Sequence, residues 1–321
     1  MSAGRILLLI FRWGIFLLAC VYIYMHIAPS KGSRTLLAML EMLRTPELSI
    51  TLFVVAMAMV VNWMLEAEKW RKLILPLQPV GRTRAFVATI AGTSVALITP
   101  NRTGEFAGRI MFLEPGHRIS GAVATMWGGV AQFVITAVFG VMAMLVYGII
   151  AGPVFHFTEF LMSGMAILAV IIAFLYMRPI MVERLLLRIP QIGRLRAYLS
   201  VLEGYSVKEL MSILFLSFIR YLVFSAQFVL LLVTMDASVD LVEAIVAVPV
   251  IFLITSIVPT VLLTEIGVRG TVAMAILAPM GAGDPNILMA TFALWAINLL
   301  LPAIAGSFIL LFAKIRLKNT A

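Results

Sequence analysis

The stretch AFVATIAGTSVALITPNRTGEFAGR, residues 85–109, breaks the pattern of a strongly apolar chain. Its apolar part, 85–99, has only 15 residues and ends at Pro100, whereas a helix needs about 20 residues to cross the hydrocarbon core of a bilayer. A charged, glycine-containing turn follows, and then another short helix-forming segment. We therefore predict a re-entrant helical hairpin near 85–116, which enters the membrane and turns back.

A second stretch, IVAVPVIFLITSIVPTVLLTEIGVR at 245–269, repeats this design later in the chain. The apolar run 243–258 has 16 residues, which is again short for a span, and it ends before Pro259. It predicts a second re-entrant hairpin near 243–280.

Longer apolar runs surround both hairpins, and hydrophobic residues make up 63% of the 321 residues while charged residues make up only 12%. Soluble domains have about 45–50% and about 25%. No hydrophilic stretch is long enough for an attached globular enzyme. The sequence thus predicts an all-α polytopic membrane protein with one integral membrane domain over 1–321. The runs that predict its six transmembrane helices are approximately 10–28, 48–65, 121–149, 159–177, 210–234 and 287–313.

Positive charge predicts the topology. The loops 66–84 and 178–209 and the C-terminal tail are rich in Lys and Arg, whereas 148–158, 235–243 and 281–286 contain neither. Basic loops face the cytoplasm, and the six spans alternate correctly only if neither short run crosses. We expect a multi-pass protein of the inner or plasma membrane with both termini in the cytoplasm. The basic segment 29–47, placed outside, is the exception.

Two half-repeats, about 1–150 and 151–321, follow from this topology. Each half holds three spans and one hairpin, so that the second copy is inverted relative to the first. Glu105 and Glu265 are 160 positions apart, as are Arg109 and Arg269, which supports an internal duplication. Inverted repeats that meet near the midplane give many transporters two alternative access states.

The candidate functional residues gather at the turns of the two hairpins. A Glu and an Arg four residues apart share one helix face and can pair, so each pair could simply close its own hairpin. An arginine that is paired once still has donors for a phosphate, and ionisable residues at depth in a bilayer are normally paired or water-lined. The predicted substrate-binding residues are Asn101, Arg102, Glu105, Arg109, Glu265 and Arg269, with Pro100, Gly104, Pro259 and Gly267 as structural residues of the motifs. Asn101 also suits a helix cap.

Polar residues inside the spans have a structural interpretation. Asn62, Gln132, Gln227 and Asn298 are predicted to form interhelical hydrogen bonds. Arg220 is a weaker candidate for a substrate pathway, because its side chain could also reach the interface.

No metal, cofactor or nucleic-acid partner is predicted. Cys20 is the only cysteine, and the three histidines are scattered without ligand spacing. The net charge of +9 is explained by basic cytoplasmic loops that face anionic lipid.

The segments TPNRTGEFAGR (99–109) and VPTVLLTEIGVRG (258–270) resemble the transmembrane region of lysylphosphatidylglycerol synthases, the flippase-like part of the multiple peptide resistance factor. The likeness covers nearly the whole chain. Residues that match its motifs are Pro100, Arg102, Gly104, Glu105 and Arg109 in the first and Glu265, Gly267 and Arg269 in the second. The second motif departs from the glycine-rich family pattern, because 260–263 reads TVLL.

The resemblance implies movement of a lipid between leaflets. The separate cytosolic synthase domain of the bifunctional relatives is not part of these 321 residues, so synthase activity is not expected. We expect a non-enzymatic, flippase-like transporter of an anionic or modified lipid. Its expected protein partner is another membrane protein or a second copy of the same chain. The alternatives are a membrane-embedded glycosyl- or group-transferase that acts on a lipid carrier, and a non-transporting partner subunit of a lipid-modifying enzyme.

Overall fold

The computed structural model describes residues 45–97, 99, 102–150, 158–235, 239–258, 262–281 and 284–312. The first predicted span, 10–28, and the motif residues Pro100, Asn101 and Pro259 lie outside these ranges. Every regular element within them is helical, as the predicted all-α class requires.

Four of the predicted spans correspond to long apolar helices. α3 (Pro46–Ile74), α6 (Arg118–Ile150) and α10 (Val207–Thr234) are each long and apolar enough to cross a membrane. The fourth runs from α13 (Asp284–Trp295) through a π-helical turn, η6 (Ala296–Leu300), into α14 (Leu301–Phe312).

The predicted span 159–177 forms α7 (Thr158–Tyr176), and the chain then bends by 97° into α8 (Pro179–Leu186). Together the two helices could form a fifth span. Pro179 explains the break between them, because proline fits the first turn of a new helix and restricts the residue before it. The remaining short elements are η2 (Pro115–His117), η3 (Gly193–Leu195), α9 (Arg196–Leu199), η4 (Ser200–Gly204) and η5 (Ala278–Met280).

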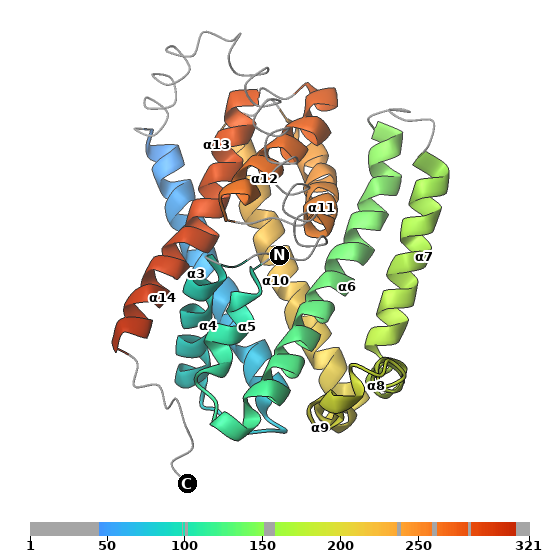
Figure 1. The fold of residues 1–321 in the computed structure, drawn as a ribbon. Helices are drawn as coiled ribbons and strands as arrows, with labels where there is room; N and C mark the ends of the chain where they lie inside the picture. The colour runs from blue at the N-terminus through green and yellow to red at the C-terminus, as the bar shows by residue number, and fades with distance from the viewer. Residues whose placement is uncertain are drawn as a thin grey trace, which may run out of the picture.

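Two pairs of short helices stand where the hairpins were predicted. α4 (Arg82–Leu97) packs against α5 (Gly104–Ile110), and α11 (Leu241–Ile257) packs against α12 (Leu262–Leu277). The first pair lies in the lower half of the molecule and the second in the upper half (Figure 1). Their re-entry into the membrane and the inverted relation of the two halves remain predictions.

Glycine permits the close approach of α4 and α5. A Cβ atom added to Gly108 would lie 2.6 Å from the Cα atom of Gly92, so the two backbones touch. Arg102, in the turn between the helices, has a φ of 57°, in the left-handed region that costs a residue with a side chain about 1–2 kcal/mol.

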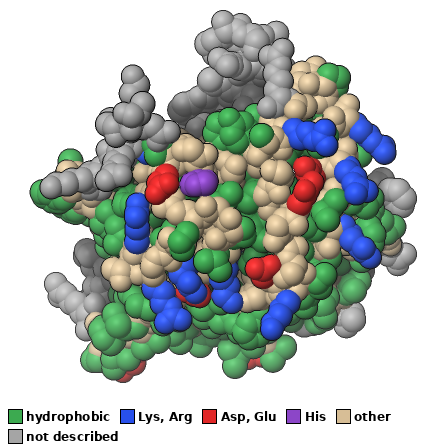
Figure 2. Space-filling view, turned by 90° about the horizontal axis from the view of Figure 1, so that it is seen from below, with side chains coloured by type: hydrophobic (Ala, Val, Ile, Leu, Met, Phe, Trp, Pro, Cys, Tyr) green, Lys and Arg blue, Asp and Glu red, His purple; other side chains and the backbone are tan. Residues whose placement is uncertain are grey.

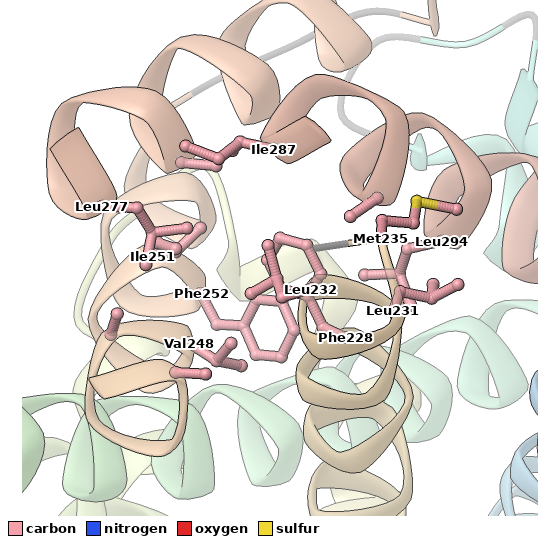
Figure 3. Packing of buried hydrophobic residues seen from close by; sticks show 14 of the residues in the cluster. Phe228, Leu231, Leu232, Met235, Val248, Ile251, Phe252, Leu277, Ile287 and Leu294 are labelled. Carbon is pink, nitrogen blue, oxygen red and sulfur yellow. The ribbon is translucent and has the colours of Figure 1, made fainter. Parts of the chain in front are cut away.

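Buried apolar side chains form a cluster at each end of the bundle. In the upper cluster, the Phe228 ring of α10 stacks on the Phe252 ring of α11 with centroids 5.9 Å apart (Figure 3). The lower cluster gathers around Trp70 of α3 and includes Trp127 and Tyr176. α10 contributes to both clusters and so joins the two ends of the molecule.

One end of the molecule is basic. Figure 2 views this end, which is the lower end of Figure 1, and many Lys and Arg side chains cover it. Exposed basic residues of the lower loops and short helices are Arg82, Arg84, Arg178, Arg184, Arg188, Arg196 and Lys208. The basic loop residues that predicted the cytoplasmic side therefore lie on one face of the molecule.

Candidate functional site: a charged cavity between the two helix pairs

Both helix pairs contribute to one cavity of about 470 Å³. Arg102, Glu105 and Arg109 reach it from the first pair, and Arg269 reaches it from the second. The spans α3, α6, α10 and the α13–η6 segment complete the wall. Its polar and charged members include Asn62, Glu66, Lys69, Gln132 and Arg220, and its apolar and aromatic members include Trp63, Phe106, Phe133, Phe224, Phe228, Ile251, Phe252 and Trp295.

The first motif builds a chain of ion pairs along α5. Arg109 donates from Nη2 to Oε1 of Glu105, one helical turn earlier, as the spacing predicted. Arg102 Nη2 lies 3.5 Å from Oε2 of the same carboxylate. The helix begins at Gly104, whose backbone N–H donates to Thr99 Oγ1 at 2.7 Å. A threonine side chain thus satisfies the first free N–H group of α5.

The second motif makes the equivalent pair on α12. Arg269 donates from Nε to Glu265 Oε1 at 3.0 Å, and its Nη2 lies 2.8 Å from the same oxygen. Glu265 is buried behind Arg269, and Gly267 is buried between them in the chain. Arg269 therefore presents the charge of this motif to the cavity.

The sequence prediction missed Glu66, the carboxylate at the centre of the site. Glu66 Oε2 lies 2.7 Å from Lys69 Nζ on the same helix and also accepts a hydrogen bond from Arg220 Nη1 of α10. Glu66 Oε1 accepts from Arg109 Nη1 of α5 at 2.7 Å. One carboxylate therefore binds three cations from three helices.

The sequence places Glu66 and Lys69 in the predicted basic loop 66–84, whereas α3 continues to Ile74. The available signal was helical spacing. Asn62, Glu66 and Lys69 are separated by four and three residues, which places them on one face of a helix.

Arg220 belongs to the wall of the cavity. Its Nε donates to Asn62 Oδ1 at 3.0 Å, and its guanidinium carbon lies 5.9 Å from the centre of the Trp63 ring, within the range of a cation–π contact. Gln132 Oε1 accepts a third, longer hydrogen bond from Arg220 at 3.4 Å. These contacts hold the guanidinium group against α3 and α6.

Interhelical hydrogen bonds are confirmed for three of the four polar span residues. Gln227 donates to the backbone carbonyl of Val55 at 2.7 Å, and Gln132 donates to that of Ser217 at 3.3 Å. Asn62 accepts from Arg220. The prediction is wrong for the side chain of Asn298, which donates to Leu294 of its own helix at 3.1 Å.

The backbone of Asn298 makes the contact that its side chain does not. Pro302, four residues later, has no N–H to donate to this carbonyl, and the indole Nε1 of Trp63 donates to it at 3.2 Å instead. The π-helical turn thereby connects the last span to α3 beside the cavity. Such turns are frequent at functional sites.

The cavity has an excess of positive charge. Among the described residues, five basic side chains and two carboxylates line it, and Glu265 adds a third carboxylate behind Arg269. The Lys69 and Arg109 side chains are only 2% exposed. Within the described ranges, no three His, Cys, Asp or Glu residues are placed to hold a metal ion. The arrangement is suited to binding an anion at the polar wall and an apolar group at the aromatic wall.

Comparison with known proteins gives a family match. The model of the family described as the lysylphosphatidylglycerol synthase TM region matches residues 9–306. No curated protein and no solved structure matches the chain significantly.

Proposed function

The chain belongs to the family of lysylphosphatidylglycerol synthase transmembrane regions, and from this premise we propose that it is a flippase-like transporter that moves an anionic lipid between the leaflets of the cell membrane. The observation that carries the proposal is the cavity shared by the two helix pairs. Arg102 and Arg109 reach it from one pair and Arg269 from the other. A phosphate can be received by either set of guanidinium groups.

The size and lining of the cavity support a lipid head group as the ligand. Its volume of about 470 Å³ lies within the range of about 300–1,000 Å³ that is typical of small-molecule sites. Phe224, Phe228 and Phe252 form an apolar wall near the cations. A head group would occupy the polar side while apolar groups contact this wall.

The placement of the helix pairs supports a mechanism of alternating access. In this proposal both pairs are re-entrant hairpins within six spans, the basic end and both termini face the cytoplasm, and the half-repeats 1–150 and 151–321 are inverted. Each hairpin would then approach the central cavity from a different side of the membrane, as in inverted-repeat transporters. The protein performs no covalent chemistry on the lipid in this mechanism.

Reconstitution into liposomes with a fluorescent anionic lipid tests the proposal. A membrane-impermeant quencher reports the exposure of head groups in the outer leaflet over time. We expect the purified chain to accelerate lipid movement, and Arg109→Ala and Arg269→Ala to slow it at least about tenfold, because each removes a charge-assisted contact. Arg184→Ala, at the exposed surface of α8, is the matched control and should retain movement.

The other outcomes discriminate the alternatives. Unaltered movement in both cavity variants would refute the assignment of the site. A new lipid species on chromatography would favour a group-transferase, and the absence of both movement and product would favour a partner subunit.

A further inference from the structure

The charges that surround the cavity do not balance. Glu66 and Glu105 are each already bound by more than one cation, and Glu265 is paired with Arg269. Five cations therefore share three carboxylates among the described residues, which leaves two positive charges in excess. The segments next to the hairpin turns that lie outside the description, 98, 100–101 and 259–261, contain no charged residue.

Two buried donors without a partner belong to arginines of this cavity. Nε of Arg102 and Nε of Arg109 are buried and have no hydrogen-bond partner among the described residues. Both arginines belong to the wall of the cavity, and Arg109 is only 2% exposed. A buried N–H group without a partner is costly, so the two unpaired donors add to the unfavourable excess of positive charge at these arginines.

From the charge excess and these two donors, we propose that the head group bound here carries at least two negative charges, as a phosphomonoester or a diphosphate does. A phosphodiester carries one charge and would leave half of the excess uncompensated. A phosphomonoester carries about −1.5 to −2 at pH 7 and has three oxygens that accept hydrogen bonds. The inference rests on the proposed function, because it assigns the substrate class of the same cavity.

Competitive binding to the purified full chain in detergent micelles tests the inference. The probes are phosphatidic acid, phosphatidylglycerol and phosphatidylcholine with identical acyl chains, and soluble diphosphate. At pH 8 we expect phosphatidic acid to bind about tenfold more tightly than phosphatidylglycerol, and phosphatidylcholine to bind most weakly. Near pH 5 the ratio of phosphatidic acid to phosphatidylglycerol affinity should fall towards one. The second pKa of a phosphomonoester is about 6, so its second charge is lost below that pH.

Charge variants tie the preference to the cavity. Arg102→Gln and Arg269→Gln each remove one excess charge, one in each helix pair, and should lower the ratio of phosphatidic acid to phosphatidylglycerol affinity several-fold. Arg184→Gln removes an exposed charge from α8 and should leave the ratio unchanged. Thermal unfolding without lipid identifies a variant that fails to fold. If one of the two cavity variants fails, the affinity ratio of the other variant tests the inference.

Each result has a defined meaning. Equal affinity for phosphatidic acid and phosphatidylglycerol at pH 8 would overturn the inference and leave lipid transport intact. An unchanged ratio in the folded cavity variants would also overturn it, because the preference would then arise at the surface. Tight binding of soluble diphosphate with no binding of any lipid would support the charge inference but contradict the proposed function.

Discussion

Glu66 is the residue on which the charged site depends. It binds Lys69, Arg109 and Arg220, and its own side chain is only 8% exposed. The hairpin motifs drew attention to the arginines because their spacing is visible in the sequence. The carboxylate that holds them lies near the end of a span, where charges commonly belong to a loop, and a single sequence does not show how far the helix continues.

Replacing Glu66 by glutamine should destabilise the protein strongly. The change leaves three cations, of which Lys69 and Arg109 are buried, without their shared carboxylate, and removing one member of a buried ion pair costs about 3–5 kcal/mol. We expect a clearly lower midpoint of thermal unfolding in detergent, with partial recovery on addition of phosphatidic acid, whose phosphate supplies the lost negative charge.

Glu68→Gln is the matched control, because Glu68 pairs with Arg71 on the same helix but both side chains are 25% exposed. A surface pair contributes only about 0.2–1 kcal/mol. Equal loss of stability in the two variants would show that Glu66 has no special role.

At the scale of elements, the length of the apolar runs and the positions of the prolines predicted the short first helix of each pair well. The runs 85–99 and 243–258 correspond to α4 and α11, which end at Leu97 and Ile257, shortly before the prolines at 100 and 259. The 97° bend before Pro179 and the π-helical turn at Ala296–Leu300 were not predicted. Pro179 accounts for the bend only once the structure shows that α8 begins there, and the π-helical turn makes a tertiary contact, the bond from Trp63 to the Asn298 carbonyl, that local sequence does not encode.

The contact between α4 and α5 is the element that should tolerate substitution least. Gly108→Ala would place a Cβ atom 2.6 Å from the Cα atom of Gly92 and force the two helices apart. Overpacking of this kind costs about 1–3 kcal/mol. We expect a lower unfolding midpoint and, because α5 carries Arg109, weaker binding of anionic lipid.

Gly164→Ala in α7 provides the comparison, since no atom lies within 4 Å of the added Cβ. There alanine should leave the unfolding midpoint unchanged or raise it, because glycine is about 0.5–1 kcal/mol less favourable inside a helix. A similar loss in both variants would mean that the close packing of α4 on α5 does not limit stability.

At the scale of the whole molecule, the sides from which the helix pairs open decide the architecture. Positive charge and run length predicted that α4–α5 opens towards the basic end and α11–α12 towards the other end. Single cysteines in a Cys20→Ser background test this with a membrane-impermeant thiol reagent. Gly81→Cys and Gly116→Cys flank the first pair, and Asp240→Cys and Ala278→Cys flank the second, all at exposed positions.

We expect the first two cysteines to react from one side of the membrane and the last two from the opposite side. If Gly81→Cys and Gly116→Cys react from different sides, α4–α5 crosses the membrane and the inverted-repeat architecture is wrong. The sequence was sufficient to predict the opposed openings of the two pairs. That both pairs line one cavity could be seen only from the arrangement of the spans in space.

The binding of three cations to the Glu66 carboxylate has a further consequence for the proposed transport cycle. A phosphate that enters the cavity and takes Arg109 or Arg220 replaces a carboxylate that already occupies the same donors. Loading then resembles an ion exchanger, in which one anion leaves its cations as another arrives. In the proposed transport cycle, Glu66 would take the guanidinium groups back when the lipid departs, so the empty site would reorient within the low-dielectric interior with much of its cationic charge neutralised.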